Sequence, residues 1–177
     1  MPVSNIKDQF ANRFAGTVTE TVAGTIAIEE IPTNVDVFAK QAFVLHRLEY
    51  IIPSTVLALM IGANDSISIA IVNSPNVVNI TPTSMNPTDP AVVDIFNINF
   101  SLRGAAANFA YQQMPFVRSF TDMPGGGLIV AARPLYIAIQ GDSLAAVAGA
   151  YFKGYFTRKE LKPEDYMDLV DYYRMIS

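Results

Sequence analysis

The feature that most constrains the fold is a series of short segments rich in β-branched and aromatic residues. Several of them alternate between apolar and polar positions, as a strand with one buried face does. Turn residues such as Gly, Pro, Asn and Asp separate the segments, which is typical of a sandwich or a barrel. The clearest candidates are residues 17–31, 41–52, 66–73, 128–140 and 144–157.

Residues 41–52 (QAFVLHRLEYII) are a strong strand candidate and contain the chain's only histidine. Successive side chains of a strand point to opposite faces. We therefore expect two faces along this strand, one with Val44, His46, Leu48 and Tyr50 and the other with Phe43, Leu45, Arg47 and Glu49.

Turn and cap signals predict how the segments connect. Residues 55–62 and 66–73 are expected to form a hairpin about residues 63–65, followed by a long Pro- and Asn-rich loop over 74–90. The Asp89-Pro90 pair resembles a helix start and predicts a short helix near 90–96. Residues 97–112 are then expected to form a strand that bends at Gly104. Pro134 argues for a break or an edge position within residues 128–140.

The carboxyl end changes from strand-like to helical spacing. Pro163 suits the first position of a helix, and Glu164 and Asp165 suit its first turn, where the helix dipole favours anions. This predicts a helix near 163–175 that turns Tyr166, Leu169, Val170 and Tyr173 inward. We expect an all-β chain of about eight strands with these two helices. Residues 1–16 are assigned to an amino-terminal arm and 17–177 to one domain.

The composition points to large contacts with other proteins. The chain of 177 residues is 51% hydrophobic but only 16% charged, below the usual share of about 25%. A surface poor in charge usually meets another protein, a membrane or a ligand. The longest apolar stretch, 51–63, contains Pro53 and is too short for a membrane span. Subunit interfaces are the better explanation.

The chain offers few residues for catalysis or for a cofactor. It has no cysteine and one histidine, so thiolate sites and two-histidine metal sites are excluded. We interpret His46 as a partly buried residue satisfied by a hydrogen bond. Gly125, Gly126 and Gly127 lack the Lys that a phosphate-binding loop requires and precede a β-branched strand instead. We therefore predict no enzyme activity, no cofactor and no metal site.

Aromatic residues are the candidates for subunit contacts. Phe10 and Phe14 lie four apart in the expected arm, where they would dock on a neighbouring subunit; a disordered tail is the alternative. Phe116 and Phe120 have few basic residues near them, so core or subunit-contact use is favoured over stacking on bases.

The last third of the chain resembles small single jelly-roll coat proteins of icosahedral viruses. The resemblance rests on two runs, MPFVRSFTDMPGGGLIVAARPLYIAIQG and GYFTRKELKPEDYMDLVDYYRMI, and on FVLHRLEYIIP earlier in the chain. It implies a jelly roll of eight strands in two sheets and closed, symmetric self-assembly. It also implies a structural virion protein assembled in the host cytoplasm.

One departure from this family concerns the genome. Many such coat proteins carry a basic amino-terminal arm, whereas the first 30 residues here contain only Lys7 and Arg13 as basic groups. Because phosphate binding needs clustered Lys and Arg, contact with nucleic acid is expected to be weak or absent. Coat proteins of membrane-containing viruses fit this pattern better, with a second coat protein or an internal membrane as further partners.

Two other functions remain open from the sequence. A β-sandwich that recognises a glycan or a host receptor would use the exposed loop 73–90. A hydrolase or isomerase on a β-barrel would need a site around His46, the only imidazole.

Overall fold

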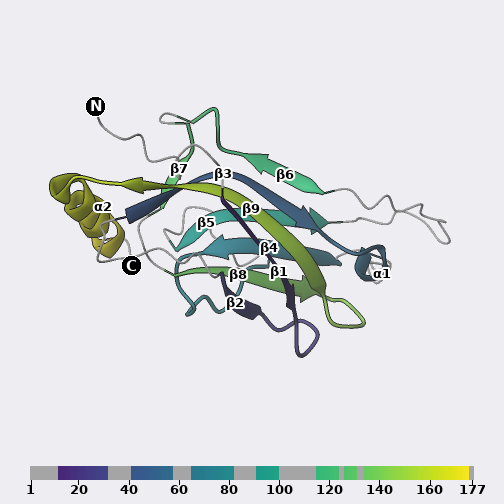
Figure 1. The fold of residues 1–177 in the computed structure, drawn as a ribbon. Coiled ribbons are helices and arrows are strands. Elements are labelled where there is room, and N and C mark those ends of the chain that lie inside the picture. The colour runs from purple at the N-terminus through teal and green to yellow at the C-terminus, as the bar shows by residue number, and fades with distance from the viewer. Residues whose placement is uncertain are drawn as a thin grey trace.

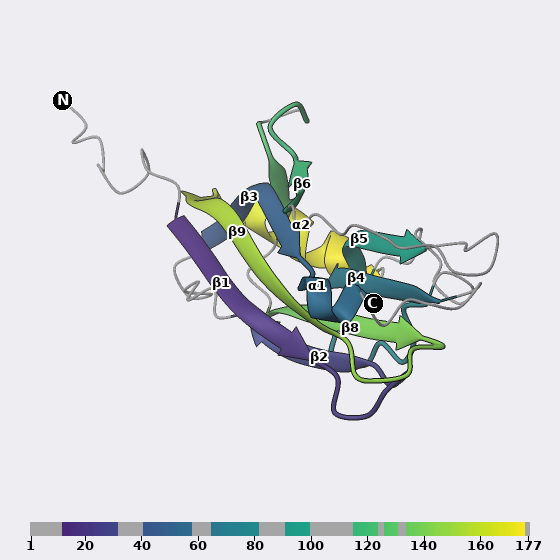
Figure 2. The same cartoon turned by 90° about the vertical axis from the view of Figure 1, so that its right-hand side faces the viewer.

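The computed structural model describes residues 12–31, 41–57, 65–81, 91–99, 115–123, 126–130 and 134–175. Within these ranges the chain forms nine strands and two helices, arranged as a two-layer sandwich with one helix at each end (Figures 1 and 2). The elements are β1 (Asn12–Thr19), β2 (Ala27–Ile31), β3 (Gln41–Ile51), α1 (Ser54–Leu57), β4 (Ser66–Val72), β5 (Val92–Asn99), β6 (Phe116–Ser119), β7 (Leu128–Val130), β8 (Leu135–Asp142), β9 (Gly149–Glu160) and α2 (Pro163–Met175).

The strands form two antiparallel sheets with jelly-roll strand order. Sheet A has the order β1-β9-β3-β6, and β7 also pairs with β3. Sheet B has the order β2-β8-β4-β5. The chain passes between sheets at every connection except β4–β5 and β6–β7, which confirms the predicted all-β jelly roll. β6 and β7 pair with successive parts of β3, so together they occupy the place of one interrupted strand.

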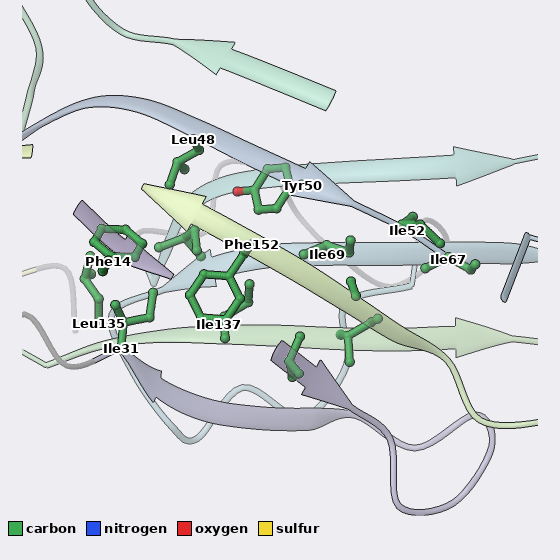
Figure 3. Packing of buried hydrophobic residues seen from close by; sticks show 14 of the residues in the cluster. Phe14, Ile31, Leu48, Tyr50, Ile52, Ile67, Ile69, Leu135, Ile137 and Phe152 are labelled. Carbon is green, nitrogen blue, oxygen red and sulfur yellow. The ribbon is translucent and has the colours of Figure 1, made fainter. Parts of the chain in front are cut away.

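The core lies between the sheets and is built from the inward positions of both (Figure 3). On β4, Ile67, Ile69 and Ile71 are fully buried, as the alternation in this segment predicts. A smaller cluster lies on the opposite face of sheet B, where Ile80 from the loop after β4 covers Ala70, Val72 and Ala138. Sheet B is therefore apolar on both faces, which explains why every residue of β4 is buried.

A bulge at His46 divides β3 and makes the predicted face assignment wrong. The pairing between β3 and β9 skips a residue between Leu45 and Arg47. Because one extra residue shifts the alternation by one position, the core-facing side chains change parity at this point. The core residues of β3 are accordingly Phe43 and Leu45 before the bulge, and Leu48 and Tyr50 after it.

Two other predicted elements are wrong. The segment near 90–96 is not a helix but belongs to strand β5, which pairs along the whole length of β4 through residues 92–99. Residues 54–57 form the short helix α1 where the first arm of a hairpin over 55–62 was expected. The predicted strand over 97–112 and its bend at Gly104 lie mostly outside the described residues, apart from the end of β5.

The amino-terminal strand begins earlier than the sequence indicated. β1 starts at Asn12, so residues 12–16, assigned to an arm, pair with β9 inside sheet A. Residues 17–31 hold the end of β1 and all of β2, and the turn between them contains Gly24 with φ of 77°. That turn carries the chain from sheet A to sheet B, which a single alternating pattern does not reveal.

The predicted break at Pro134 and the predicted terminal helix are confirmed. Pro134 precedes β8, which lies in sheet B, whereas β7 lies in sheet A. Helix α2 stands at one end of the sandwich beyond the end of β9 (Figure 1). Tyr166, Leu169 and Val170 are its partly buried side chains, as expected from their spacing, and the side chain of Tyr173 lies outside the described set.

A buried carboxylate fixes the turn between β8 and β9. Glu20, only 3% exposed, accepts hydrogen bonds from the backbone N–H groups of Gly141 (2.8 Å) and Ala148 (2.7 Å). The Glu20 N–H in turn donates to the Ala148 carbonyl at 2.9 Å. Because buried backbone donors are costly to leave unpaired, this carboxylate holds the turn in place and has a structural role.

Candidate functional site

The candidate site is the margin of the sandwich where the edge strands of the two sheets, β5 and β6, face each other. This region, which we call the β5–β6 margin, encloses an open hollow of about 430 Å³. The hollow is lined by Val93, Asp94, Val117, Arg118, Ser119, Phe120, Met123 and Leu128.

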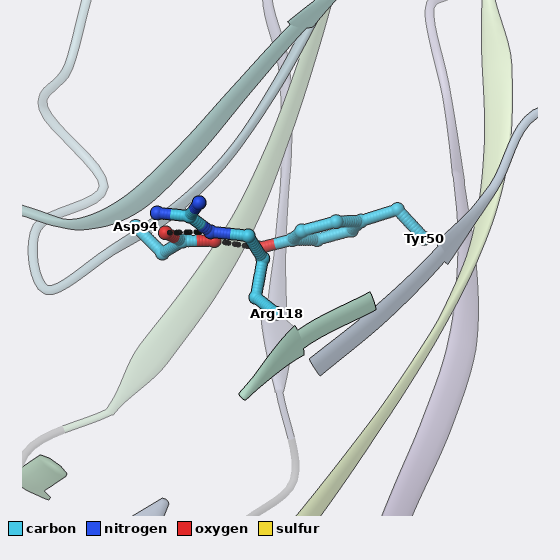
Figure 4. Close-up of polar contacts among 3 residues, drawn as sticks. All are labelled: Tyr50, Asp94 and Arg118. Carbon is cyan, nitrogen blue, oxygen red and sulfur yellow. Dashed lines mark hydrogen bonds and ion pairs between the residues drawn. The ribbon is translucent and has the colours of Figure 1, made fainter. Parts of the chain in front are cut away.

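A polar cluster ties the two sheets together at this margin (Figure 4). The Tyr50 hydroxyl donates to Asp94 Oδ2 at 3.0 Å, and Arg118 Nε–H donates to Asp94 Oδ1 at 3.1 Å. Tyr50 comes from β3 and Arg118 from β6, both in sheet A, while Asp94 comes from β5 in sheet B. The cluster therefore bridges the layers with one carboxylate and two donors.

Burial differs sharply between the two charged groups of this cluster. The Asp94 side chain is 4% exposed, whereas the Arg118 side chain is 53% exposed. Burial raises the pKa of the Asp94 carboxyl above its ordinary value of 3.8, while the Arg118 charge and the Tyr50 hydroxyl oppose the shift. Burial, and then the Asp94 charge, raise the pKa of the Tyr50 phenol well above 10.0, so the hydroxyl stays protonated and donates.

Aromatic stacking adds a second link between the edge strands. The rings of Phe96 on β5 and Phe116 on β6 have centroids 4.3 Å apart and are tilted by 33°. Phe96 also stacks on Tyr50, with a centroid distance of 6.2 Å. Tyr50 therefore takes part in both the polar and the aromatic contacts between the two sheets.

His46 and the glycine-rich loop, considered separately in the sequence, meet next to this margin. His46 Nδ1 lies 2.9 Å from the Gly126 carbonyl and Nε2 lies 2.9 Å from Thr157 Oγ1. Because a carbonyl can only accept, Nδ1 carries a proton and donates it to Gly126, while the Thr157 hydroxyl can either donate to Nε2 or accept from it. A Cβ at Gly127 would lie 2.5 Å from Val44 Cγ1, so glycine is required for this close approach.

The interpretation of His46 as a satisfied, partly buried histidine is confirmed. Both ring nitrogens are engaged by uncharged groups, and no carboxylate orients the ring as a catalytic base would require. In the part of the chain that the structure describes, no group of His, Asp or Glu is arranged to hold a metal ion. Within the same residues, neither helix has the length and apolar character needed to span a bilayer.

The four aromatic residues predicted as subunit contacts have different places. Phe14 is 5% exposed and packs on Phe152 and Phe156 of its own chain. Phe116 and Phe120 lie at the β5–β6 margin, where Phe116 contacts Phe96 and Phe120 lines the hollow. Phe10 is outside the described residues.

Sequence reasoning missed Asp94, Val117, Arg118 and Met123 as members of this site. The signal for Asp94 is a single charge among apolar residues in AVVDIFNI, at the same parity as Phe96 and Ile98. In a strand, this alternation places the Asp94 carboxylate on the core-facing side together with Phe96 and Ile98. The exposed apolar side chains Val117 (46%) and Met123 (43%) carry no comparable signal, because their exposure depends on β6 lying at an edge.

The fold defines the class to which these observations belong: the chain is a jelly roll of the kind found in viral coat proteins. Three solved polyomavirus structures are similar to it. VP1 of trichodysplasia spinulosa-associated polyomavirus covers 87% of this chain and 97% of its own, with a TM-score of 0.52 and 8% identity. The unassembled Merkel cell polyomavirus VP1 pentamer has a TM-score of 0.51 and 9% identity, with coverages of 87% and 97%. The unassembled KI polyomavirus VP1 pentamer has a TM-score of 0.51 and 12% identity, with coverages of 92% and 98%.

These similarities establish the fold, since identities this low do not carry function with them. No protein-family model matches the chain, and no curated protein is similar to it in sequence.

Proposed function

We propose that the protein is a structural capsid subunit that self-assembles into an icosahedral shell, with the virion as its location and the host cytoplasm as the place of assembly. The observation that carries this proposal is the jelly-roll strand order, which the chain has in common with VP1 coat proteins, two of them solved as pentamers. The low share of charged residues and the exposed apolar side chains at the β5–β6 margin add support. A coat protein needs no catalytic site, and none is proposed.

Size-exclusion chromatography with light scattering tests this proposal on the purified chain. We expect oligomers, because obligate assemblies bury on the order of 2,000 Å² or more per interface and rarely leave free subunits. The measurement should cover several salt concentrations and pH values, since electrostatic contacts depend on both. A strict monomer at high protein concentration under all of these conditions would rule the proposal out.

The same proposal includes little or no direct contact with the genome. The chain carries a net charge of −4, and on sheet A the Arg47 side chain is already paired with Glu49 at 2.8 Å. A membrane layer or a second coat protein would then separate this shell from nucleic acid. Nucleic acid that copurifies with particles and resists high salt would contradict this part of the proposal.

A second candidate function, glycan recognition by the same subunit, is favoured by a second hollow at the opposite end of sheet A from α2. It measures about 350 Å³, and none of its described lining residues is charged. Tyr151, 49% exposed, stands beside the hydroxyls of Thr17 and Thr19 there. An exposed aromatic ring next to hydroxyl groups suits the apolar face and the hydroxyls of a sugar. VP1 proteins with this fold were solved with the GM1 oligosaccharide and with disialyllactose.

If this hollow binds a glycan, the wild-type chain should give specific signals on a glycan array. Tyr151→Ala should abolish them, because the stacking surface is lost. Tyr155→Ala, on the same strand and face but outside the hollow, is the matched control and should leave the signals intact. An array without hits for the wild-type protein would remove this candidate.

A further inference from the structure

The guanidinium of Arg118 has N–H donors that no described residue accepts from. Only its Nε–H is bonded to Asp94, through a contact of 3.1 Å. Figure 4 shows the two terminal nitrogens of Arg118 on the side away from Tyr50. Within the described residues these nitrogens have no other partner, and the side chain is 53% exposed in the hollow. An arginine in this state can still receive a carboxylate in the geometry that guanidinium groups favour.

The surroundings of Arg118 indicate that a protein surface covers it. Val117 and Met123 are 46% and 43% exposed and lie at the hollow with Arg118. A cation ringed by apolar side chains is characteristic of the centre of protein interfaces, where arginine is enriched and water is excluded. The expected occupant therefore presents a carboxylate flanked by apolar residues.

The opposite margin of the same sandwich offers such a segment. β2 is the edge strand of sheet B at the far side from β5, and its sequence is AIEEI. Glu29 and Glu30 are both exposed, with Ile28 and Ile31 beside them. Glu29 pairs in register with the core residue Ile137, so its side chain projects on the core side of β2, as the side chain of Arg118 does on β6. Neither glutamate has an ion pair with another described residue.

Charge is also divided between the sheets in a way that favours this pairing. The described strands of sheet B carry Glu29, Glu30, Asp94 and Asp142 but no Lys or Arg. The basic strand residues all lie in sheet A: Arg13, Arg47, Arg118, Lys153, Arg158 and Lys159. Two identical copies side by side therefore have complementary rather than repelling edges when the β2 edge of one meets the β6 edge of the other.

We infer that the β5–β6 margin is the docking site for the β2 edge of a second copy of this chain, with Glu29 of that copy bound by Arg118. This inference rests on the proposed self-assembly and specifies its contact. The contact joins two different surfaces, so it is heterologous. Repeated around an axis, a heterologous contact closes a ring, which is the unit that a symmetric shell requires. It also covers two edge strands that would otherwise be open to uncontrolled pairing.

Disulfide cross-linking tests this contact with no background, because the chain has no cysteine. The double variant Glu29→Cys/Met123→Cys, with Met123 an exposed lining residue of the hollow, should form a covalent ladder on a non-reducing gel when the assembled protein is oxidised. Each single variant should stay monomeric, because a heterologous contact does not place a residue against its own copy. A mixture of the two single variants should stop at dimers. Glu160→Cys/Met123→Cys is the matched control, since Glu160 is an exposed strand glutamate on β9, in the other sheet from β2, and should give no ladder.

Charge reversal provides a second measurement that needs no bond formation. Glu29→Lys should raise the protein concentration needed for assembly by about tenfold or more, whereas Glu160→Lys, with the same change in net charge, should leave it unchanged. Arg118→Lys retains the charge beside Asp94 but loses the two-pronged donor, so it should weaken assembly while the subunit stays folded.

The outcomes separate this inference from the proposed function. If the wild-type chain never assembles, both fail. If it assembles but the double variant gives no ladder and Glu29→Lys assembles normally, only the inferred contact is wrong. Dimers from Met123→Cys alone would also overturn it, because they would place two β5–β6 margins face to face.

Discussion

Replacement of Phe14 by alanine should lower the free energy of unfolding by about 3–5 kcal/mol, the usual loss for truncating a buried phenylalanine. The ring lies over Gly154 on β9, where a Cβ would overlap it, and its centroid is 6.2 Å from that of Phe152 and 5.8 Å from that of Phe156. Removing it opens a cavity between β1 and the centre of sheet A. Urea denaturation of unassembled subunits, followed by far-UV circular dichroism, measures the change.

This variant also shows whether Phe14 is mainly a subunit contact or a core residue. If it were mainly a subunit contact, as its place in an expected arm suggested, Phe14→Ala would unfold like the wild type but fail to assemble. If it is a core residue, as its burial indicates, the isolated subunit is already destabilised. Val22→Ala serves as the control, since Val22 is 60% exposed in a turn and its truncation should change stability by less than about 0.5 kcal/mol.

Replacement of Arg118 by alanine should destabilise the subunit by about 3 kcal/mol at neutral pH, at the lower end of the range for breaking a buried pair because Arg118 itself is half exposed. The cause is the buried Asp94 carboxylate, which would lose its only charged partner and keep the hydrogen bonds from the Tyr50 hydroxyl and the Ile95 backbone N–H. Arg118→Lys keeps a positive charge near Asp94, so it should destabilise the subunit less than Arg118→Ala does.

The size of this effect should depend on pH, in a direction that follows from the raised pKa of Asp94. A carboxyl with a pKa above its unfolded value binds protons more tightly in the folded state, so folding is favoured below about pH 4 and loses stability as pH rises through the folded pKa. The Arg118 charge lowers the pKa of Asp94, so removing this charge raises the pKa further. The loss of folding stability with rising pH then continues to higher pH. The difference between the wild type and Arg118→Ala should therefore grow from pH 4 to pH 7. A difference that shrinks over this range would show that the Asp94 charge is not its source.

The sequence predicts much of this fold because its strongest signals are local. The alternation of Ile67, Ile69 and Ile71 is enough to place β4, and Pro163 with the acidic residues after it is enough to start α2. The errors arose where tertiary pairing outweighed a local signal. Residues 92–96 have a plausible helix cap before them but belong to a strand that pairs with β4. The bulge at His46 lies where the partner of β3 changes from β7 to β6, and no local pattern marks that point.

The candidate site was harder to predict because its parts are distant in sequence. Tyr50, Asp94 and Arg118 come from three strands, and they meet only because the jelly roll brings β5 and β6 to one margin. Phe116 and Phe120 were selected as contacts from composition alone. Both lie at that margin, with Arg118 between them in the sequence, and their use as subunit contacts stays a prediction.

Electron microscopy of the purified, concentrated protein tests the central claim most directly. We predict closed, hollow particles of uniform diameter, or rings that are their building units, since a jelly-roll subunit with complementary edges should assemble through symmetric contacts. Particles should be lost in Glu29→Lys and retained in Glu160→Lys. Dispersed single subunits of the wild-type protein, across the same range of salt and pH, would contradict the assignment of this chain as a self-assembling coat protein.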